Sequence, residues 1–179
     1  MEKNKKLIIN VLLVAILVVI AIGRSYSYLN VTDTNNSKIS TIDLKNGKID
    51  IAFSGSNIIE IKNPKAQNNP IVSKTFTLTG TNNNDMPNPY YVTLVINENT
   101  FEDGALKYNI VSNNYSNNGS IIETIKPAKE LNGKNNITFG PGTFNKGTNA
   151  VHTYTLNIYY LKDTNKSGTF KGTIGISAE

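Results

Sequence analysis

The stretch Ser73-Lys74-Thr75-Phe76-Thr77-Leu78-Thr79 decides the fold class. In it, threonines alternate with Phe76 and Leu78, so an extended chain would have one polar face and one apolar face. Residues 151–158, Val-His-Thr-Tyr-Thr-Leu-Asn-Ile, show a similar period of two in the apolar set Tyr154, Leu156 and Ile158. Alternation of this kind is typical of β-strands with one buried face, and we predict a strand in each stretch.

Segments with the same period continue through the chain from residue 37, separated by clusters of Asn, Gly and Pro. The best helix candidate, residues 121–131, is interrupted by Pro127, so we expect at most a short turn there. An all-β domain is therefore predicted over residues 37–179, a two-sheet antiparallel sandwich of jelly-roll type. The predicted strands are residues 37–44, 48–53, 58–62, 73–79, 90–97, 105–111, 121–125, 137–139, 152–161 and 168–177.

Several connections between these strands can also be predicted. Asn46-Gly47 lies between two apolar runs and indicates a hairpin, since a type I′ turn favours these residues at its centre. Asp103-Gly104 predicts a second tight turn, and Gly140-Pro141-Gly142 predicts a third. The loops 82–89 and 113–119 are too polar to bury, so we expect surface connections.

The N-terminus has the layout of an export signal. A basic start, Met-Glu-Lys-Asn-Lys-Lys, precedes the apolar run 7–22, and small residues follow it. Ser25 and Ser27 occupy the −3 and −1 positions of a cut after Ser27, which would start the mature chain at Tyr28. We therefore predict a signal peptide over residues 1–27, a signal peptidase as a partner, and a secreted or cell-surface location.

Two alternatives to this cut stay open. Cleavage could follow Gly23, with Ala21 at −3. The segment could also remain as an uncleaved membrane anchor, although a 16-residue helix spans about 24 Å, less than the roughly 30 Å of a bilayer core.

Composition argues against several classes of function. The 179 residues include no cysteine and one histidine, which excludes thiolate catalysis and Cys-based metal sites. Removing residues 1–27 leaves 14 basic and 12 acidic side chains without a concentrated basic face, so we expect no nucleic-acid partner. Phosphate-binding and nucleophile motifs are missing. We predict no enzyme activity, no cofactor, and neither catalytic nor metal-binding residues.

The remaining reactive side chains have ordinary structural interpretations. We expect His152 to be an exposed strand residue, and His152→Ala to behave like the parent. Glu102-Asp103 is expected to be a solvated pair in a turn. Neighbouring residues on a strand point to opposite faces, so Tyr90-Tyr91 and Tyr159-Tyr160 should each place one ring in the core and one outside.

Residues 28–36 have the pattern of a short strand and a link. Leu29 and Val31 share one face of an extended segment, and Asn30 and Thr32 share the other. Together with Tyr28 they form our predicted strand-exchange segment. The alternative is that residues 28–36 are a disordered remnant of signal processing.

Several segments along the chain together resemble the TasA/camelysin family of exported Firmicutes proteins. The end of the signal resembles the aromatic and small stretch of that family, residues 39–44 resemble its GTLDL-like strand, and residues 69–78 resemble its PGDxxSKTFTV strand. The segments are Arg-Ser-Tyr-Ser-Tyr-Leu at 24–29, Thr-Asp-Thr at 32–34, Ile-Ser-Thr-Ile-Asp-Leu at 39–44, Asn-Pro-Ile-Val-Ser-Lys-Thr-Phe-Thr-Leu at 69–78, Tyr-Tyr-Val-Thr-Leu at 90–94, and the C-terminal pair 152–156 and 168–174.

The resemblance implies a jelly-roll subunit of an extracellular matrix fibre, in which an N-terminal strand completes the sheet of a neighbouring subunit. The implied partners are other copies of the chain, with matrix proteins or polysaccharide as further candidates. A tethered or secreted adhesin, or ligand-binding sandwich, is the alternative. A secreted metallopeptidase is a third, disfavoured by the single histidine.

Overall fold

The computed structural model describes residues 39–44, 47–161 and 168–178, and this part of the chain is all β. Its strands form a six-stranded sheet, in the order β1-β2-β4-β9-β6-β7, and a four-stranded sheet, in the order β3-β10-β5-β8, with every pairing antiparallel. The strands are β1 (Ile39–Leu44), β2 (Gly47–Phe53), β3 (Ile58–Lys62), β4 (Val72–Asn82), β5 (Asn88–Asn99), β6 (Leu106–Asn114), β7 (Lys129–Glu130), β8 (Ile137–Phe144), β9 (Gly147–Tyr160) and β10 (Thr169–Ala178).

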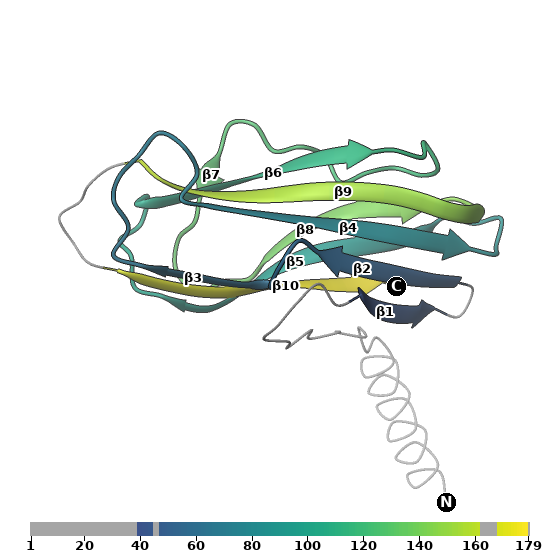
Figure 1. Cartoon of the computed structure of the whole chain (residues 1–179), viewed down its shortest axis with the longest axis horizontal. Helices are drawn as coiled ribbons and strands as arrows, with labels where there is room; N and C mark the ends of the chain where they lie inside the picture. Colours follow the sequence, from purple (N-terminus) through teal and green to yellow (C-terminus); the bar gives the residue numbers. More distant parts are fainter. Residues whose placement is uncertain (1–38, 45–46, 162–167, 179) are drawn as a thin grey trace, which may run out of the picture.

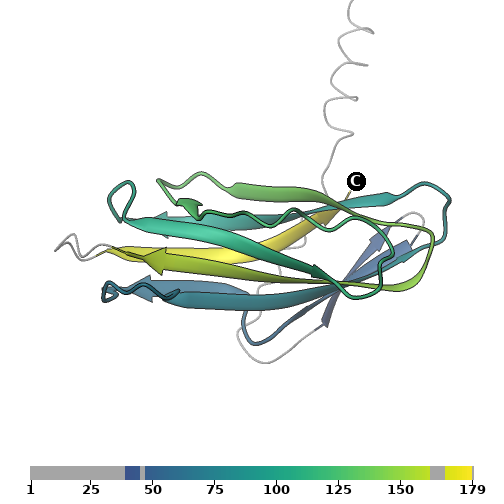
Figure 2. The same ribbon diagram turned by 90° about the horizontal axis from the view of Figure 1, so that it is seen from above.

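The two sheets stack as the layers of a sandwich, with their long strands running along one axis (Figures 1 and 2). Alternate residues of β2 to β6 and of β8 to β10 enter the space between the layers and form one apolar core. The predicted antiparallel sandwich is confirmed. The largest fully buried rings belong to Tyr90, Tyr154, Tyr160, Phe76, Phe144 and Phe170.

Most predicted strands form close to their predicted limits, and β3 matches them at both ends. β4, β5 and β9 extend beyond the alternating residues, because ladder hydrogen bonds continue into polar ends such as Gly147–Ala150. The predicted strand at residues 121–125 is wrong, since the chain there has no regular ladder. A two-residue strand, β7, forms a few residues later and pairs with β6.

The β1–β2 hairpin is confirmed, but the reason given for Gly47 is wrong. Leu44 pairs with Gly47, so Gly47 is the first residue of β2 rather than the centre of a turn. A Cβ at this position would lie 2.0 Å from the carbonyl oxygen of Thr81 on β4. Glycine is needed at residue 47 for close strand packing. Residues 45 and 46 lie outside the described part of the chain.

Two other turn predictions have different outcomes. Asp103-Gly104 does form a tight turn, in which the Ala105 amide donates to the Glu102 carbonyl and Gly104 has a φ of +77°. Gly140-Pro141-Gly142 is not a turn, because it continues β8 through an irregularity in the pairing with β5. The polar loop 82–89 is also shorter than predicted. Asn82 belongs to β4 and is buried, with its amide bonded to the carbonyls of Met86 and Phe144.

Candidate functional site

The open edge of the four-stranded sheet is β3, which pairs with β10 on one side only. The Asn57 carbonyl accepts from the Ile174 amide, and the Asn63 amide donates to the Gly168 carbonyl. Backbone groups in an antiparallel ladder face alternate sides, so Ile58, Glu60 and Lys62 direct theirs away from β10. No described strand pairs with this outer side of β3, where the Ile58 amide donates to the Ser56 hydroxyl at the start of the strand. The edge can accept a further strand.

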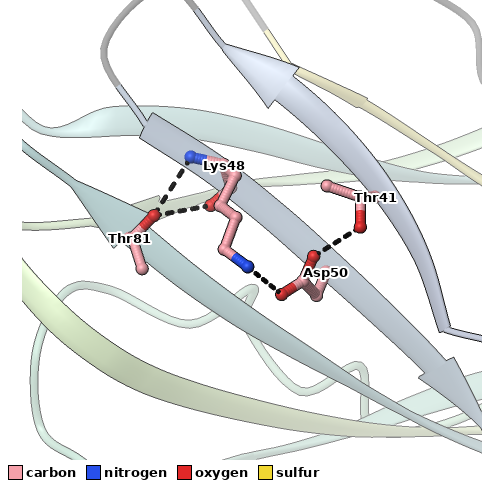
Figure 3. Close-up of polar contacts among 4 residues, drawn as sticks. All are labelled: Thr41, Lys48, Asp50 and Thr81. Carbon is pink, nitrogen blue, oxygen red and sulfur yellow. Dashed lines mark hydrogen bonds and ion pairs between the residues drawn. The ribbon is translucent and has the colours of Figure 1, made fainter.

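The corresponding edge of the six-stranded sheet is β1, which lies on β2 and has no other neighbouring strand among the described residues. Polar contacts on the solvent side connect β1 to β2, and the Lys48 amide donates to the Thr81 hydroxyl on β4 over 3.1 Å (Figure 3). The Thr41 hydroxyl donates to Asp50 over 2.7 Å, and Lys48 forms an ion pair with Asp50 at 3.0 Å. The Thr41 hydrogen bond and the Lys48 charge hold the pKa of Asp50 below its ordinary value, against a smaller opposing effect of burial.

The opposite side of the sandwich is covered by its own chain, through residues 119–131, which we call the closing segment. Against β8, the Thr143 amide donates to the Ser120 carbonyl, and the Ser120 amide donates to the Thr143 hydroxyl. Against β6, the Ile125 amide donates to the Ile110 carbonyl, and the Leu131 amide to the Leu106 carbonyl. Figure 2 shows this segment lying between β6 and β8.

The closing segment is fixed to the core at Ile122. This side chain is only 4% exposed, and its backbone amide donates to the Tyr154 hydroxyl over 3.2 Å. An irregular segment can run at the rim of a sandwich only where its backbone groups find partners, and here a core tyrosine supplies one. The chain at residues 121–125 is therefore part of the closing segment, which covers the edges of β6 and β8, and not a strand.

His152 is buried, contrary to our prediction of an exposed residue. Its exposed fraction is 0%, and its ring stacks on Phe144 with centroids 4.7 Å apart. Its Nδ1 lies 2.5 Å from the Tyr90 hydroxyl, which lies 2.5 Å from the Tyr154 hydroxyl. Because Tyr90 and Phe144 belong to the four-stranded sheet, His152 joins the two layers of the sandwich.

The direction of this hydrogen-bond chain follows from its last donor. The Ile122 amide donates to the Tyr154 oxygen, and the Tyr154 hydroxyl in turn donates to Tyr90. The Tyr90 hydroxyl then donates to Nδ1 of His152, which makes the imidazole the neutral Nε2–H tautomer. The reverse direction would leave two groups without a partner, the Tyr154 hydroxyl proton and the Nε2 lone pair, whereas this direction leaves only the Nε2 proton. Nε2 itself is buried with no hydrogen-bond partner.

Burial sets the ionisation of all three side chains. It lowers the pKa of His152 from 6.5 to about 4, because a charged imidazolium would lose its hydration in the core. Burial also raises the pKa of Tyr90 and of Tyr154. The imidazole is therefore neutral at physiological pH, and both hydroxyls keep their protons.

The burial of His152 has a sequence signal in the alternation of its own strand. Residue 152 is an even number of positions from Tyr154, Leu156 and Ile158, so strand alternation places it on their apolar face. We grouped it with the polar residues of the strand by type instead. Its partner Tyr90 could not be found this way, because it comes from the other sheet.

The predictions for the tyrosine pairs are confirmed. Tyr90 and Tyr160 are buried, whereas Tyr91 and Tyr159 are half-buried on the outer faces. Glu102 and Asp103 are exposed in the turn before β6, as predicted. Within residues 39–44, 47–161 and 168–178, no group of three or more His, Asp or Glu side chains could hold a metal ion.

The predicted cleavage and strand-exchange residues lie outside the described residues; they are Ser25, Ser27, Tyr28, Leu29, Asn30, Val31 and Thr32. The same holds for the predicted signal segment 1–27 and the link 33–36. No helix in the described part of the chain is long and apolar enough to cross a membrane.

One end of the sandwich presents exposed apolar side chains from two loops. Met86 follows β4 and is 75% exposed, and Tyr115 follows β6 and is 68% exposed. β4 and β6 both pair with β9, and their C-terminal ends lie beside its first half, at Asn82–Gly147 and Asn114–His152. The two loops therefore lie at the same end.

No protein-family model, no curated protein and no solved structure matches the chain.

Proposed function

We propose that the chain is an extracellular structural protein, the subunit of a cell-surface or biofilm-matrix fibre assembled by N-terminal strand exchange. The observation that carries this proposal is the outer edge of β3, whose backbone groups at Ile58, Glu60 and Lys62 face away from the sheet. An edge of this kind binds an extended segment by ladder hydrogen bonds. The sequence resemblance to fibre-forming matrix proteins supports the same function.

The donor in this proposal is the segment 28–32. Its alternation offers Leu29 and Val31 to an apolar surface and Asn30 and Thr32 to solvent. The inward side chains of β3 are the buried Ile59 and Ile61, so a strand added beside them would extend an existing apolar face. The donor's side chains carry no charge, and the charged side chains of β3 that would lie beside its polar face are the exposed Glu60 and Lys62.

We favour β3 over β1 as the acceptor edge because of chain length. Residues 33–38 connect the donor directly to β1, and six residues are enough for the donor to turn back onto its own β1. Such self-pairing would close the unit instead of extending it. Pairing with β3 of a second copy is a head-to-tail contact, which propagates as a filament when it does not close into a ring.

The donor is tested by Leu29→Asp combined with Val31→Asp. We expect this variant to remain folded and to form no fibres, because two carboxylates would have to enter an apolar surface. The matched control is Asn30→Asp with Thr32→Asp, which adds the same charge to the opposite face and should still polymerise. Negative-stain microscopy and light scattering are the measurements. Fibres from the first variant that match those of the parent would contradict the proposal.

The acceptor edge is tested by Glu60→Pro. Proline removes one outward-facing amide from β3 without removing a hydrogen bond to β10. We expect fibre growth to stop while the domain keeps its far-ultraviolet circular dichroism spectrum. Glu60→Thr is the control, since it removes the same carboxylate and keeps the amide. Equal polymerisation of both variants would exclude β3 as the acceptor.

A second candidate function, an adhesin that binds through loops, is supported by the exposed Met86 and Tyr115 at one end of the sandwich. Aromatic side chains are frequent anchors at binding surfaces. The test is co-sedimentation of the strand-exchange-deficient protein with insoluble cell-wall polysaccharide. Binding that is lost in Tyr115→Ser but kept in Tyr91→Ser would favour the adhesin, and no binding would exclude this polysaccharide as its ligand.

A further inference from the structure

We propose that His152 is an acid-sensitive latch, whose protonation releases the closing segment and weakens the contact between the two sheets. The inference does not depend on fibre formation. It rests on the position of the imidazole, which is fully buried on β9 and connected through Tyr90 and Tyr154 to the amide of Ile122.

Protonation would disrupt the whole hydrogen-bond chain. With a proton on both ring nitrogens, Nδ1 becomes a donor and can no longer accept from the Tyr90 hydroxyl. Tyr90 must then turn its proton toward Tyr154, whose oxygen already accepts from the Ile122 amide. The Tyr154 proton is left without an acceptor in the core. Protonation of His152 thus disturbs the hydrogen bond that anchors Ile122, because the Tyr90 and Tyr154 hydroxyls connect the two residues.

No neighbouring charge would stabilise the imidazolium. Its cross-strand partners are Leu78 on β4 and Asn114 on β6, and its partners from the other sheet are Tyr90 and Phe144. Of these residues and Tyr154, only Tyr90 and Tyr154 have titratable side chains. Burial keeps both hydroxyls protonated. Nε2 has no acceptor in either state, so its proton gains no partner that would stabilise the added charge.

The effect on stability has a defined direction. The unfolded chain binds the proton near pH 6.5, and the folded chain only near pH 4. Folding is therefore favoured by the neutral histidine above pH 6.5, and this contribution is lost as the pH falls from 6.5 to 4. The shift corresponds to an increase in the unfolding equilibrium constant of roughly 10²- to 10³-fold.

The direct test is a proton NMR titration of the full chain, in which His152 gives the only imidazole signals. We expect no titration between pH 7.5 and 5.5, a midpoint near pH 4, and a shift of the ¹⁵N-labelled Ile122 amide with the same midpoint. A histidine midpoint near 6.5 would overturn the proposal. An Ile122 amide that is indifferent to the histidine titration would overturn the link to the closing segment.

The second test compares urea unfolding of the parent and of His152→Gln at pH 7.5 and pH 4.5. Glutamine does not titrate, and its side-chain oxygen can still accept from Tyr90. We expect the parent to lose more stability on acidification than the variant, because carboxylates such as Asp50 contribute equally to both. Equal losses would overturn the proposal. If the variant does not fold, the titration of the parent still decides the matter.

Discussion

The two sides of the sandwich differ in whether the described part of the chain covers the edges of the sheets. On one side, the outer edges of β6 and β8 are covered by residues 119–131, which hydrogen-bond to both strands. On the other side, no described residue covers β3 or β1. Unpaired edges promote association, and charged side chains such as Glu60 and Lys62 are a weaker protection than a covering segment. The comparison supports our proposal that a second copy binds on the open side, at β3.

The closed side also contains a chain of hydrogen-bonded polar groups that enters the core. Ile122, Tyr154, Tyr90 and His152 form one connected chain from the cover to the centre of the molecule. A buried polar chain is stabilising only while each member keeps its partner. The closing segment is therefore held by hydrogen bonds that depend on one another, so the loss of one weakens the others.

The largest expected effect on this comparison comes from Ile122→Ala. Deleting a buried branched side chain leaves a cavity beneath the closing segment, and we expect the free energy of unfolding to fall by about 2–4 kcal/mol. Urea unfolding followed by tyrosine fluorescence measures it. The control is Glu123→Ala, an exposed neighbour in the same segment, for which we expect a change within about 0.5 kcal/mol. Equal effects of the two changes would mean that the segment is not anchored at Ile122.

A smaller loss is expected from Tyr154→Phe. The ring remains, but the Ile122 amide loses its acceptor and Tyr90 loses a partner, which should destabilise the protein by about 1–3 kcal/mol. Tyr159→Phe is the matched control, since its hydroxyl lies on the outer face and accepts from Asn109. We expect less than about 1 kcal/mol there. A neutral Tyr154→Phe would show that the polar chain does not hold the cover.

The smallest effect is expected on the open side, from Thr41→Val. Valine keeps the branched shape but removes the hydrogen bond to Asp50, and the exposed position limits the loss to under about 1 kcal/mol at pH 7. Asp50 has a lowered pKa, so its contribution is present above pH 3.8 and is lost as the pH falls through its folded value. In the variant, denaturation curves at pH 2–5 should show a smaller loss. An unchanged acid dependence would contradict this assignment.

The fold could be predicted from the sequence because its signals are local. Alternation in residues 73–79 identifies a strand without reference to any partner, and β3 was predicted at both ends. The prediction failed at residues 121–125, where the sequence resembles a strand but the chain crosses from β8, which it contacts at Ser120, to β6, which it contacts at Ile125. Which residues cover an edge depends on contacts between distant segments, and these leave no periodic pattern.

The candidate site was less predictable for the same reason. The alternation around His152 already placed it on the apolar face, so its burial was accessible from the sequence. Its link to Tyr90 joins residues 62 positions apart in different sheets, and no local pattern carries that information. The open β3 edge likewise depends on the complete strand order.

The most direct test of strand exchange uses the absence of cysteine from the chain. One preparation carries Thr32→Cys in the donor, and a second carries Glu60→Cys on β3. After mixing and mild oxidation, only contact between two copies can form a mixed disulfide. We predict a covalent heterodimer that is absent when Asp43→Cys on β1 replaces Glu60→Cys. If neither Asn30→Cys nor Thr32→Cys in the donor forms a heterodimer with Glu60→Cys, strand exchange at β3 is contradicted.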